Sequence, residues 1–121
     1  MTALPLAGRL ILLVEDDPVV ALDVEKALRA AGAKVVSAGY VESGLCTTTH
    51  PDLSAAVLDV RLWDGEGTTV GQRLRHRGVP FLLHTGYPPN DVAARWPDVP
   101  VVKKPARPGE IVAELNRLLN A

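Results

Sequence analysis

The 121-residue chain has a single cysteine and no excess of charge of either sign. Because Cys46 has no second cysteine to pair with, an internal disulfide is excluded, which is typical of a protein from a reducing compartment. The 13 lysine and arginine residues are balanced by 14 aspartate and glutamate residues. This balance gives no sign of the basic surface that contact with nucleic acid requires, and no cluster of cysteine and histidine indicates zinc.

Long hydrophobic runs are also absent, since none approaches the roughly 20 residues that cross a bilayer. Residues 1–8 are too weakly apolar for a signal peptide and are interpreted as an N-terminal tail. Residues 9–121 then form one domain, because this length allows a proper core but not a second domain. We expect a cytoplasmic protein that contacts neither membrane nor nucleic acid directly.

The sequence does contain a regular alternation of apolar runs and helical patterns. Asp17 is a favourable N-cap, Pro18 suits the first helical position, and Gly32 is typical of a helix end. Strands are expected at residues 9–15, 33–39, 53–60, 79–86 and 99–105, and helices at 16–32, 40–50, 67–78 and 106–121. The prolines of residues 87–100 leave room for about two turns of helix at most. The pattern predicts an α/β fold: a doubly wound, five-stranded parallel sheet with helices on both faces and a short or irregular fourth helix.

Polar side chains gather where the predicted strands end. The carboxyl ends of parallel strands lie along one edge of the sheet, where such folds bind ligands. The residues at these ends are Glu15, Asp16 and Asp17 after the first strand, Asp59 after the third, Thr85 after the fourth and Lys104 after the fifth. Neighbouring carboxylates repel and raise one another's pKa, so this cluster indicates a bound cation or a chemical role.

Phosphoryl transfer to an aspartate uses this set of groups. Mg²⁺ prefers oxygen ligands and commonly takes one or two carboxylates together with phosphate. Asp59 is then the nucleophile, exposed at the strand tip so that it can attack, and it forms an aspartyl phosphate. Lys104 offers a second cation, and Thr85 offers a hydroxyl donor, to the phosphoryl oxygens.

Over residues 9–120 the chain resembles the receiver domains of bacterial two-component response regulators. Four motifs carry the resemblance in the family's order and spacing: "LLVEDDP", "VLDVRL…DG.G", "LLHTG" and "VVKKP". The resemblance implies the strand order 2-1-3-4-5 and a stand-alone module that accepts a phosphoryl group on Asp59 from a sensor histidine kinase or a histidine phosphotransfer protein. It also implies one of two outputs: the module contacts an unidentified downstream protein, or it transfers its phosphoryl group onward. The resemblance further implies a signalling protein rather than an enzyme.

The resemblance further implies a metal site. Glu15 and Asp16 match the family's acidic pair, and Asp16 matches the direct ligand of Mg²⁺, for which Mn²⁺ is a substitute. Arg61 matches the position whose backbone carbonyl coordinates the metal, alongside the carboxylate of Asp59.

The remaining strand-end groups resemble the family's switch. Thr85 matches its hydroxyl, and Lys104 matches its phosphate-binding lysine, whose bond to the following proline, Pro105, the family usually holds cis. Three positions before this lysine the family often has an aromatic residue that swings inward, but this chain has Val101. The stretch "VPFLLHTGYPP" resembles the P-F-x-F-A-T-G-Y signature of a subgroup of single-domain receivers, which makes Tyr87 a candidate substitute sensor.

Two loops depart from the family pattern. Trp63 stands where the family commonly has proline and is interpreted as hydrophobic cover for its loop, with a role in sensing phosphorylation as the alternative. Asp64 adds an acid near the site. Because prolines interrupt residues 87–99, we expect this segment to be mobile in the unphosphorylated protein and not to form the family's usual dimer surface. The unphosphorylated protein is therefore expected to be a monomer.

Two other functions use related groups. A phosphatase of the haloacid-dehalogenase type also has an aspartate nucleophile, but it needs a second acid two residues later, where this chain has Arg61. A nucleotide- or flavin-binding module needs a loop rich in glycine or hydroxyl groups after its first strand. The acidic residues 15–17 would repel phosphate there, so the phosphatase stays as the alternative to the receiver.

Overall fold

The computed structural model describes residues 4–86 and 90–120 and has a five-stranded sheet at its centre. All neighbouring strands of this sheet pair in parallel. In spatial order the strands are β2 (Lys34–Ala38), β1 (Leu10–Val14), β3 (Ala55–Leu58), β6 (Phe81–Thr85) and β7 (Val101–Lys103). Since β6 and β7 are the fourth and fifth strands of this sheet along the chain, the predicted order 2-1-3-4-5 is confirmed.

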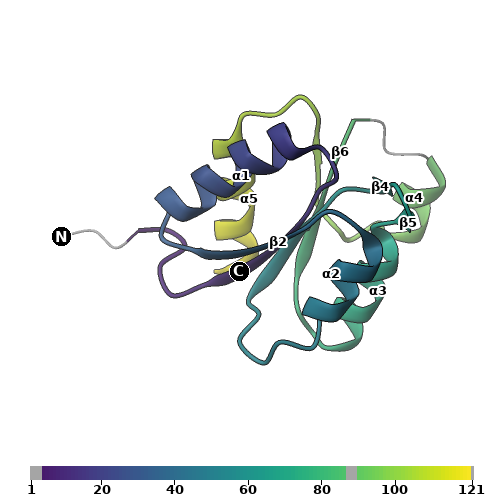
Figure 1. Ribbon diagram of the computed structural model, residues 1–121, viewed down its shortest axis with the longest axis horizontal. Helices are drawn as coiled ribbons and strands as arrows, with labels where there is room; N and C mark the ends of the chain where they lie inside the picture. Colours follow the sequence, from purple (N-terminus) through teal and green to yellow (C-terminus); the bar gives the residue numbers. More distant parts are fainter. Residues whose placement is uncertain (1–3, 87–89, 121) are drawn as a thin grey trace.

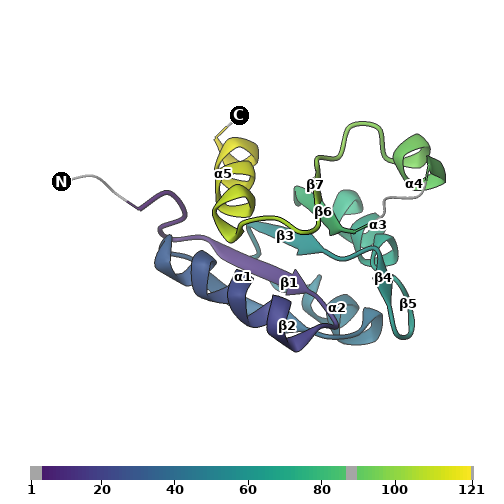
Figure 2. The same ribbon diagram turned by 90° about the horizontal axis from the view of Figure 1, so that it is seen from above.

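Helices cover both faces of the sheet (Figure 1). One face carries α1 and α5, and the other carries α2 and α3, as the doubly wound α/β prediction requires. The helices are α1 (Pro18–Ala30), α2 (Val41–Thr47), α3 (Thr68–His76), α4 (Asn90–Arg95) and α5 (Pro108–Leu119). With six residues, α4 is the shortest, and it lies on the far side of the molecule from α1 (Figure 2). The prediction of a short fourth helix is confirmed.

The core has two halves that meet at the sheet. Successive residues of β1 point to opposite faces, so Leu12 and Val14 join the α2 and α3 side while Ile11 and Leu13 join the α1 and α5 side. All four side chains are almost completely buried. This explains why the strand is a continuous apolar run rather than an alternating one.

None of the helices in the described residues is long and apolar enough to cross a membrane.

Local sequence signals fix the ends of α1. The carboxylate of Asp17 accepts hydrogen bonds from the backbone N–H groups of Val19, at 2.9 Å, and Val20, at 3.4 Å. Pro18 occupies the first helical position, where a backbone donor is not needed. Gly32 follows the helix with φ +100°, a conformation that favours glycine. The start of α1 thus lies directly after β1, at the edge where the acidic residues gather.

The N-terminal segment makes one contact that the sequence did not indicate. Leu6, within the residues expected to form a tail, is fully buried in the core between α1, α5 and the sheet. Its backbone N–H donates to the carbonyl of Ala31 at 2.8 Å. Residues 4–8 therefore form a turn that is anchored against the end of α1.

A second difference is a small antiparallel hairpin after β3. It consists of β4 (Arg61–Leu62) and β5 (Gly65–Glu66), in a segment that the sequence predicted as loop. Leu62 is 8% exposed and packs into the core on the α2 and α3 side. The hairpin thus projects from the edge of the sheet at which Asp59 lies.

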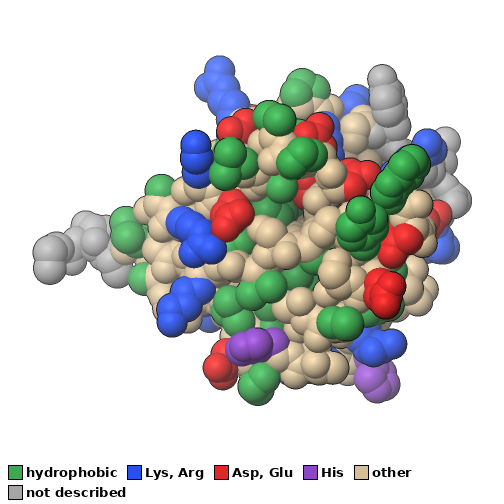
Figure 3. Space-filling model, viewed as in Figure 1, with side chains coloured by type: hydrophobic (Ala, Val, Ile, Leu, Met, Phe, Trp, Pro, Cys, Tyr) green, Lys and Arg blue, Asp and Glu red, His purple; other side chains and the backbone are tan. Residues whose placement is uncertain are grey.

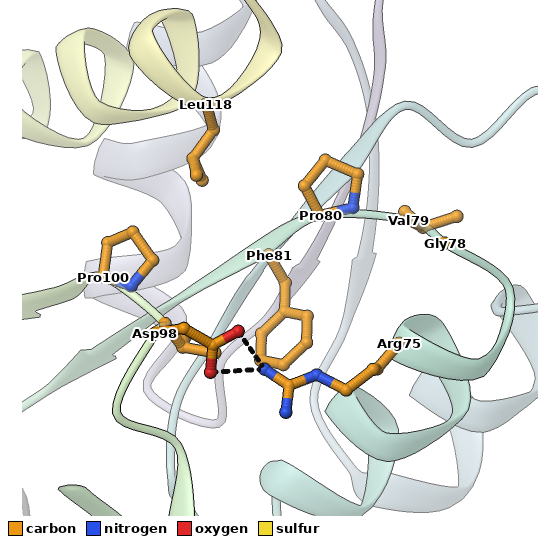
Figure 4. A pocket seen from close by; sticks show the side chains of 9 residues that line it. Arg75, Gly78, Val79, Pro80, Phe81, Asp98, Pro100 and Leu118 are labelled. Carbon is orange, nitrogen blue, oxygen red and sulfur yellow. Dashed lines mark hydrogen bonds and ion pairs between the residues drawn. The ribbon is translucent and has the colours of Figure 1, made fainter. Parts of the chain in front are cut away.

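At the other end of the sheet, a shallow cavity of about 250 Å³ lies between α3 and α5 (Figure 4). Phe81 and Leu118 line it, and Asp98 accepts two hydrogen bonds from the guanidinium of Arg75 at its side. The same guanidinium lies 4.4 Å from the ring centre of Trp96. These contacts connect α3 to the segment that follows α4.

Candidate functional site

Three of the predicted side chains meet in a hydrogen-bonded group at the carboxyl edge of the sheet. Lys104, which follows β7, donates from its Nζ to Oε1 of Glu15 at 2.6 Å and to Oδ2 of Asp59 at 3.0 Å. The two carboxylates follow β1 and β3, which are neighbours in the sheet. Parallel pairing therefore brings Lys104 together with Asp59 and Glu15, which are 45 and 89 positions away from it in the sequence.

Asp16 completes a carboxylate cluster with Glu15 and Asp59. One carboxylate oxygen from each of the three lies within 4.8 Å of the others. Glu15 and Asp59 are buried, whereas Asp16 is exposed, so the cluster has an open side. Three hard oxygen donors at this spacing fit a divalent cation such as Mg²⁺.

The burial of Glu15 changes its acidity. Burial raises its pKa to about 7 and is the largest effect; the charge of Asp59 adds to it, while hydrogen bonds from Lys104 and from the N–H of Asp17 act in the opposite direction. Burial would lower the pKa of Lys104, but the hydrogen bonds and charges of the two carboxylates outweigh it and raise that pKa. The ammonium is therefore the fixed charge of this group, and Glu15 takes up a proton more readily than an ordinary glutamate does.

Asp59 lies at the floor of the cluster. Its backbone N–H donates to the carbonyl of Val14 at 2.9 Å, and its Oδ1 accepts from the backbone N–H of Arg61 at 3.3 Å. The residue is only 7% exposed, so the expectation of an exposed aspartate was wrong. Both of its carboxylate oxygens have a partner, because Oδ2 accepts a hydrogen bond from Lys104 and Oδ1 accepts one from the N–H of Arg61.

Thr85 and Lys104 are joined through the backbone. Thr85 is the last residue of β6 and is buried, and its carbonyl accepts a hydrogen bond from the N–H of Lys104 at 2.8 Å. The peptide bond between Lys104 and Pro105 is cis. The threonine and the lysine therefore emerge side by side from neighbouring strands at the edge that holds Asp59.

Gly67 is a site residue that the sequence did not single out. A Cβ at this position would lie 1.8 Å from the backbone oxygen of Asp59, and the N–H of Gly67 donates to the carbonyl of Val60 at 2.8 Å. Only glycine allows the chain to pass this close to the back of the aspartate. The second glycine of the "DG.G" motif was the available signal.

We expect Gly67→Ala to destabilise the protein by about 3 kcal/mol, because the added methyl group forces the backbone away from Asp59. Gly109→Ala is the matched control, since a Cβ there meets no atom within 4 Å. In α5 that change should be neutral or stabilising by about 0.5–1 kcal/mol. Urea unfolding measures both, and equal stability of the two variants would contradict the close approach.

Asp64 has a role other than the one expected. Its two carboxylate oxygens accept hydrogen bonds from the N–H groups of Val41, at 2.7 Å, and Glu42, at 3.2 Å. The first of these bonds is the main cause that lowers the pKa of Asp64. The carboxylate thus caps the start of α2 from a distance of 23 residues in the sequence, and it is not one of the three clustered carboxylates.

The interpretation of Trp63 as hydrophobic cover was wrong, because the residue is 84% exposed. Val101, at the position of the family's aromatic, is 39% exposed. Tyr87, the candidate substitute sensor, lies outside the described residues. Arg61 is exposed at the start of the hairpin, next to Asp59.

His84 is a buried base beside this group. It is 3% exposed, and its Nε2 has no hydrogen-bond partner among the residues that the structure describes. Burial lowers its pKa to about 4, and the positive charge of Lys104 contributes to the same direction. Between pH 6.5 and 4 the unfolded chain therefore binds a proton at this histidine that the folded chain does not bind.

As the pH falls from about 7 to about 4, we expect His84 to lower the free energy of unfolding by about 3 kcal/mol in total. Below pH 4 it should cause no further loss. The raised pKa of Glu15 acts in the opposite direction between pH 7 and 4.5, so the comparison has to be made between variants. Urea unfolding of His84→Ala should lack the histidine's contribution, whereas His76→Ala, at an exposed position, should keep it. Identical pH dependence of the two variants would contradict a buried, neutral His84.

The comparisons with known proteins agree with this geometry. No family model matches the chain. A curated relative, the probable transcriptional regulatory protein TcrX of Mycobacterium tuberculosis, is 38% identical over 77 residues, which are 62% of this chain and 33% of that protein. The alignment therefore spans only about a third of the length of this relative.

Solved structures match nearly the whole chain. A response regulator receiver protein from Sinorhizobium medicae has a TM-score of 0.87 and 24% identity, covering 94% of this chain and 96% of that one. A CheY-like receiver domain protein from Methanospirillum hungatei has a TM-score of 0.86 and 23% identity, with 94% and 95% covered. The receiver domain of a sensor histidine kinase from Pseudomonas aeruginosa, with a magnesium ion coordinated in its active site cleft, has a TM-score of 0.84 and 24% identity, with 95% and 100% covered. This chain therefore has the CheY-like receiver-domain fold of response regulators.

Proposed function

We propose that this protein is a phosphorelay receiver whose Asp59 accepts a phosphoryl group from a protein phosphohistidine. The observation that supports it most is the single ammonium of Lys104 bound to both Asp59 and Glu15, with Asp16 completing the carboxylate cluster. Two buried carboxylates, one exposed carboxylate and one lysine thus meet at the edge where α/β folds of this kind bind ligands. Such a group favours chemistry on a charged substrate.

The carboxylates of Glu15, Asp16 and Asp59, with the backbone carbonyl of Arg61, would hold Mg²⁺, or Mn²⁺ in its place. When bound, the metal neutralises charge on the transferring phosphoryl group. The donor set fits this ion, and the Pseudomonas aeruginosa neighbour contains magnesium in its cleft. Burial and the charge of Asp59 raise the pKa of Glu15, and a bound cation would oppose both effects.

Each side chain has a defined part in the transfer. A carboxylate oxygen of Asp59 attacks phosphorus, the new P–O bond forms, and the P–N bond to the donor imidazole breaks with its electron pair left on nitrogen. The ammonium of Lys104 moves from the free carboxylates to the incoming phosphoryl oxygens, and the hydroxyl of Thr85 donates to the same group. Release of Lys104 from Glu15 couples phosphorylation to a change at this edge.

This function implies a setting. The donor is a sensor histidine kinase or a histidine phosphotransfer protein in the cytoplasm. The phosphorylated receiver then either contacts a downstream protein or transfers its phosphoryl group onward. Residues 9–121, with the anchored turn of residues 4–8, form the receiver domain. It is monomeric without phosphate and catalyses only its own phosphorylation and dephosphorylation. Thr85, with Tyr87 and Val101 as further candidates, carries the switch. A multiple-turnover phosphatase of the haloacid-dehalogenase type is the competing activity.

Incubation with Mg²⁺ and acetyl phosphate tests the proposal, with intact-protein mass as the readout. We expect one phosphoryl group per chain, none in the presence of a chelator, and slow loss of the adduct without repeated turnover. Failure to form an adduct with Mg²⁺ would contradict a receiver. Continuous hydrolysis of a phosphate monoester would favour the phosphatase.

Replacement of Asp16 tests the metal site. Asp16→Ala should weaken Mg²⁺ binding by at least about tenfold, which corresponds to about 1.4 kcal/mol. The free energy of unfolding should be unchanged or higher, because the change relieves repulsion among the carboxylates. Calorimetric titration with Mg²⁺ and urea unfolding measure the two effects, and an unchanged Mg²⁺ affinity would remove Asp16 from the site.

A further inference from the structure

Trp63 is exposed although the hairpin that carries it is firmly attached. Leu62, just before it, is buried in the core, and Asp64, just after it, is hydrogen-bonded to the start of α2. At the base of the hairpin, Glu66 accepts from the hydroxyl of Thr68 at 3.0 Å and from the guanidinium of Arg95 at 3.2 Å. The indole is therefore held in solvent by an anchored turn.

The same anchor brings Tyr40 next to this indole. The hydrogen bond from the N–H of Val41 to Asp64 joins the residue that follows Tyr40 to the residue that follows Trp63. The two aromatic residues, together with Asp16 and Gly39, line a cavity of about 410 Å³. We call this cavity the aromatic cleft. Tyr40 is 51% exposed and Trp63 is 84% exposed, so the rings of both residues remain available for a partner.

Acidic side chains surround the aromatic cleft. Asp16 lines it, and Asp17, Glu42 and Asp64 are exposed on the segments that border it. On the side where Figure 1 places the β4–β5 hairpin, Figure 3 shows protruding hydrophobic side chains beside acidic ones. Arg61 is the basic residue of the hairpin, and it does not line the cleft. This charge repels phosphate-bearing polymers and anionic membranes, whereas it attracts a cation.

We propose that the aromatic cleft binds an arginine side chain of the protein that docks at this edge to donate the phosphoryl group to Asp59. This inference rests on the proposed receiver function. A guanidinium stacks on the faces of Trp and Tyr rings and pairs with carboxylates, and these are the groups that the cleft presents. Trp, Tyr and Arg are also the residues that contribute most to protein interfaces. Because the turn that carries the indole is already anchored, binding has to order the side chain of Trp63 but not its backbone.

The test uses N-acetyl-arginine amide, titrated into the metal-free full-length protein in the presence of a chelator. The two indole N–H resonances are followed by NMR. The resonance of Trp63 should shift and saturate, while that of the buried Trp96 should not move. N-acetyl-citrulline amide, which has the same shape without the charge, should cause no saturable shift. A Trp63 resonance that stays still, or that responds equally to citrulline, would overturn the proposal.

Variants separate this proposal from the receiver function. Tyr40→Leu should weaken arginine binding roughly two- to fivefold, the factor expected for one exposed cation–π contact. Tyr40→Leu and Trp63→Ala should both keep normal phosphorylation by acetyl phosphate with Mg²⁺, since neither residue belongs to the carboxylate cluster. Arginine affinity unchanged in Tyr40→Leu would exclude the cleft. If the wild-type protein is not phosphorylated by acetyl phosphate with Mg²⁺, the result would instead count against the receiver function.

Discussion

Asp59→Asn is expected to abolish phosphorylation, with no phosphoryl adduct under conditions that modify every wild-type chain. The amide nitrogen and oxygen that replace the carboxylate cannot attack phosphorus, and the other clustered acids do not replace it. Glu15 is buried behind the ammonium of Lys104, and Asp16 is exposed on the open side. Intact-protein mass after incubation with Mg²⁺ and acetyl phosphate measures the loss.

Asp17→Asn is the matched control for this experiment. Asp17 is an exposed carboxylate adjacent to the cluster, but its side chain caps α1, a role that asparagine fills equally well. This variant should be phosphorylated like wild type. A phosphoryl group that still appears on Asp59→Asn, or that disappears from Asp17→Asn, would assign the acceptor to another residue.

Replacement of Lys104 should cause the second large effect. Lys104→Met leaves the carboxylates of Glu15 and Asp59 buried without their cation, which costs about 3 kcal/mol at pH 8. The cost should shrink at pH 5, because Glu15 takes up a proton and the repulsion disappears. Phosphorylation by acetyl phosphate should slow by about 10²-fold, since the transferring group loses its fixed positive charge.

Two further variants identify the cause. Lys103→Met removes the neighbouring exposed lysine and should change neither stability nor rate. Adding Glu15→Gln to Lys104→Met should restore much of the stability at pH 8 but not the phosphorylation rate. Urea unfolding at the two pH values measures the first effect. A Lys104→Met variant as stable as Lys103→Met at pH 8 would mean that the two ion pairs contribute nothing.

The arrangement of the sheet could be predicted from sequence because it follows from local patterns. A continuous apolar run such as residues 9–15 indicates a strand that is buried on both faces, and the cap formed by Asp17 and Pro18 indicates where the next helix starts. Once the strands are parallel, their carboxyl ends lie along one edge. The meeting of Glu15, Asp59 and Lys104 therefore follows from topology, with no knowledge of side-chain geometry.

The parts that the sequence did not indicate depend on contacts between distant residues. Asp64 looked like a further acid of the site, and only the fold shows that its carboxylate caps α2. The hairpin has two residues in each strand, too few for any period to appear. Leu6 lies in a short segment without a helix or strand period, and its burial depends on where α1 ends. The close approach of Gly67 to the backbone oxygen of Asp59 has the same origin, since it depends on the hairpin that lies between the two residues.

The central claim is that one divalent cation and Lys104 make Asp59 able to accept a phosphoryl group. A crystal structure with Mg²⁺ and beryllofluoride, a mimic of the phosphoryl group, tests it most directly. We predict beryllofluoride on a carboxylate oxygen of Asp59, Mg²⁺ bound by Asp16 and Asp59, and the Nζ of Lys104 shifted from Glu15 to a fluorine. Beryllofluoride at any other residue, or Mg²⁺ bound without Asp16 and Asp59, would contradict it.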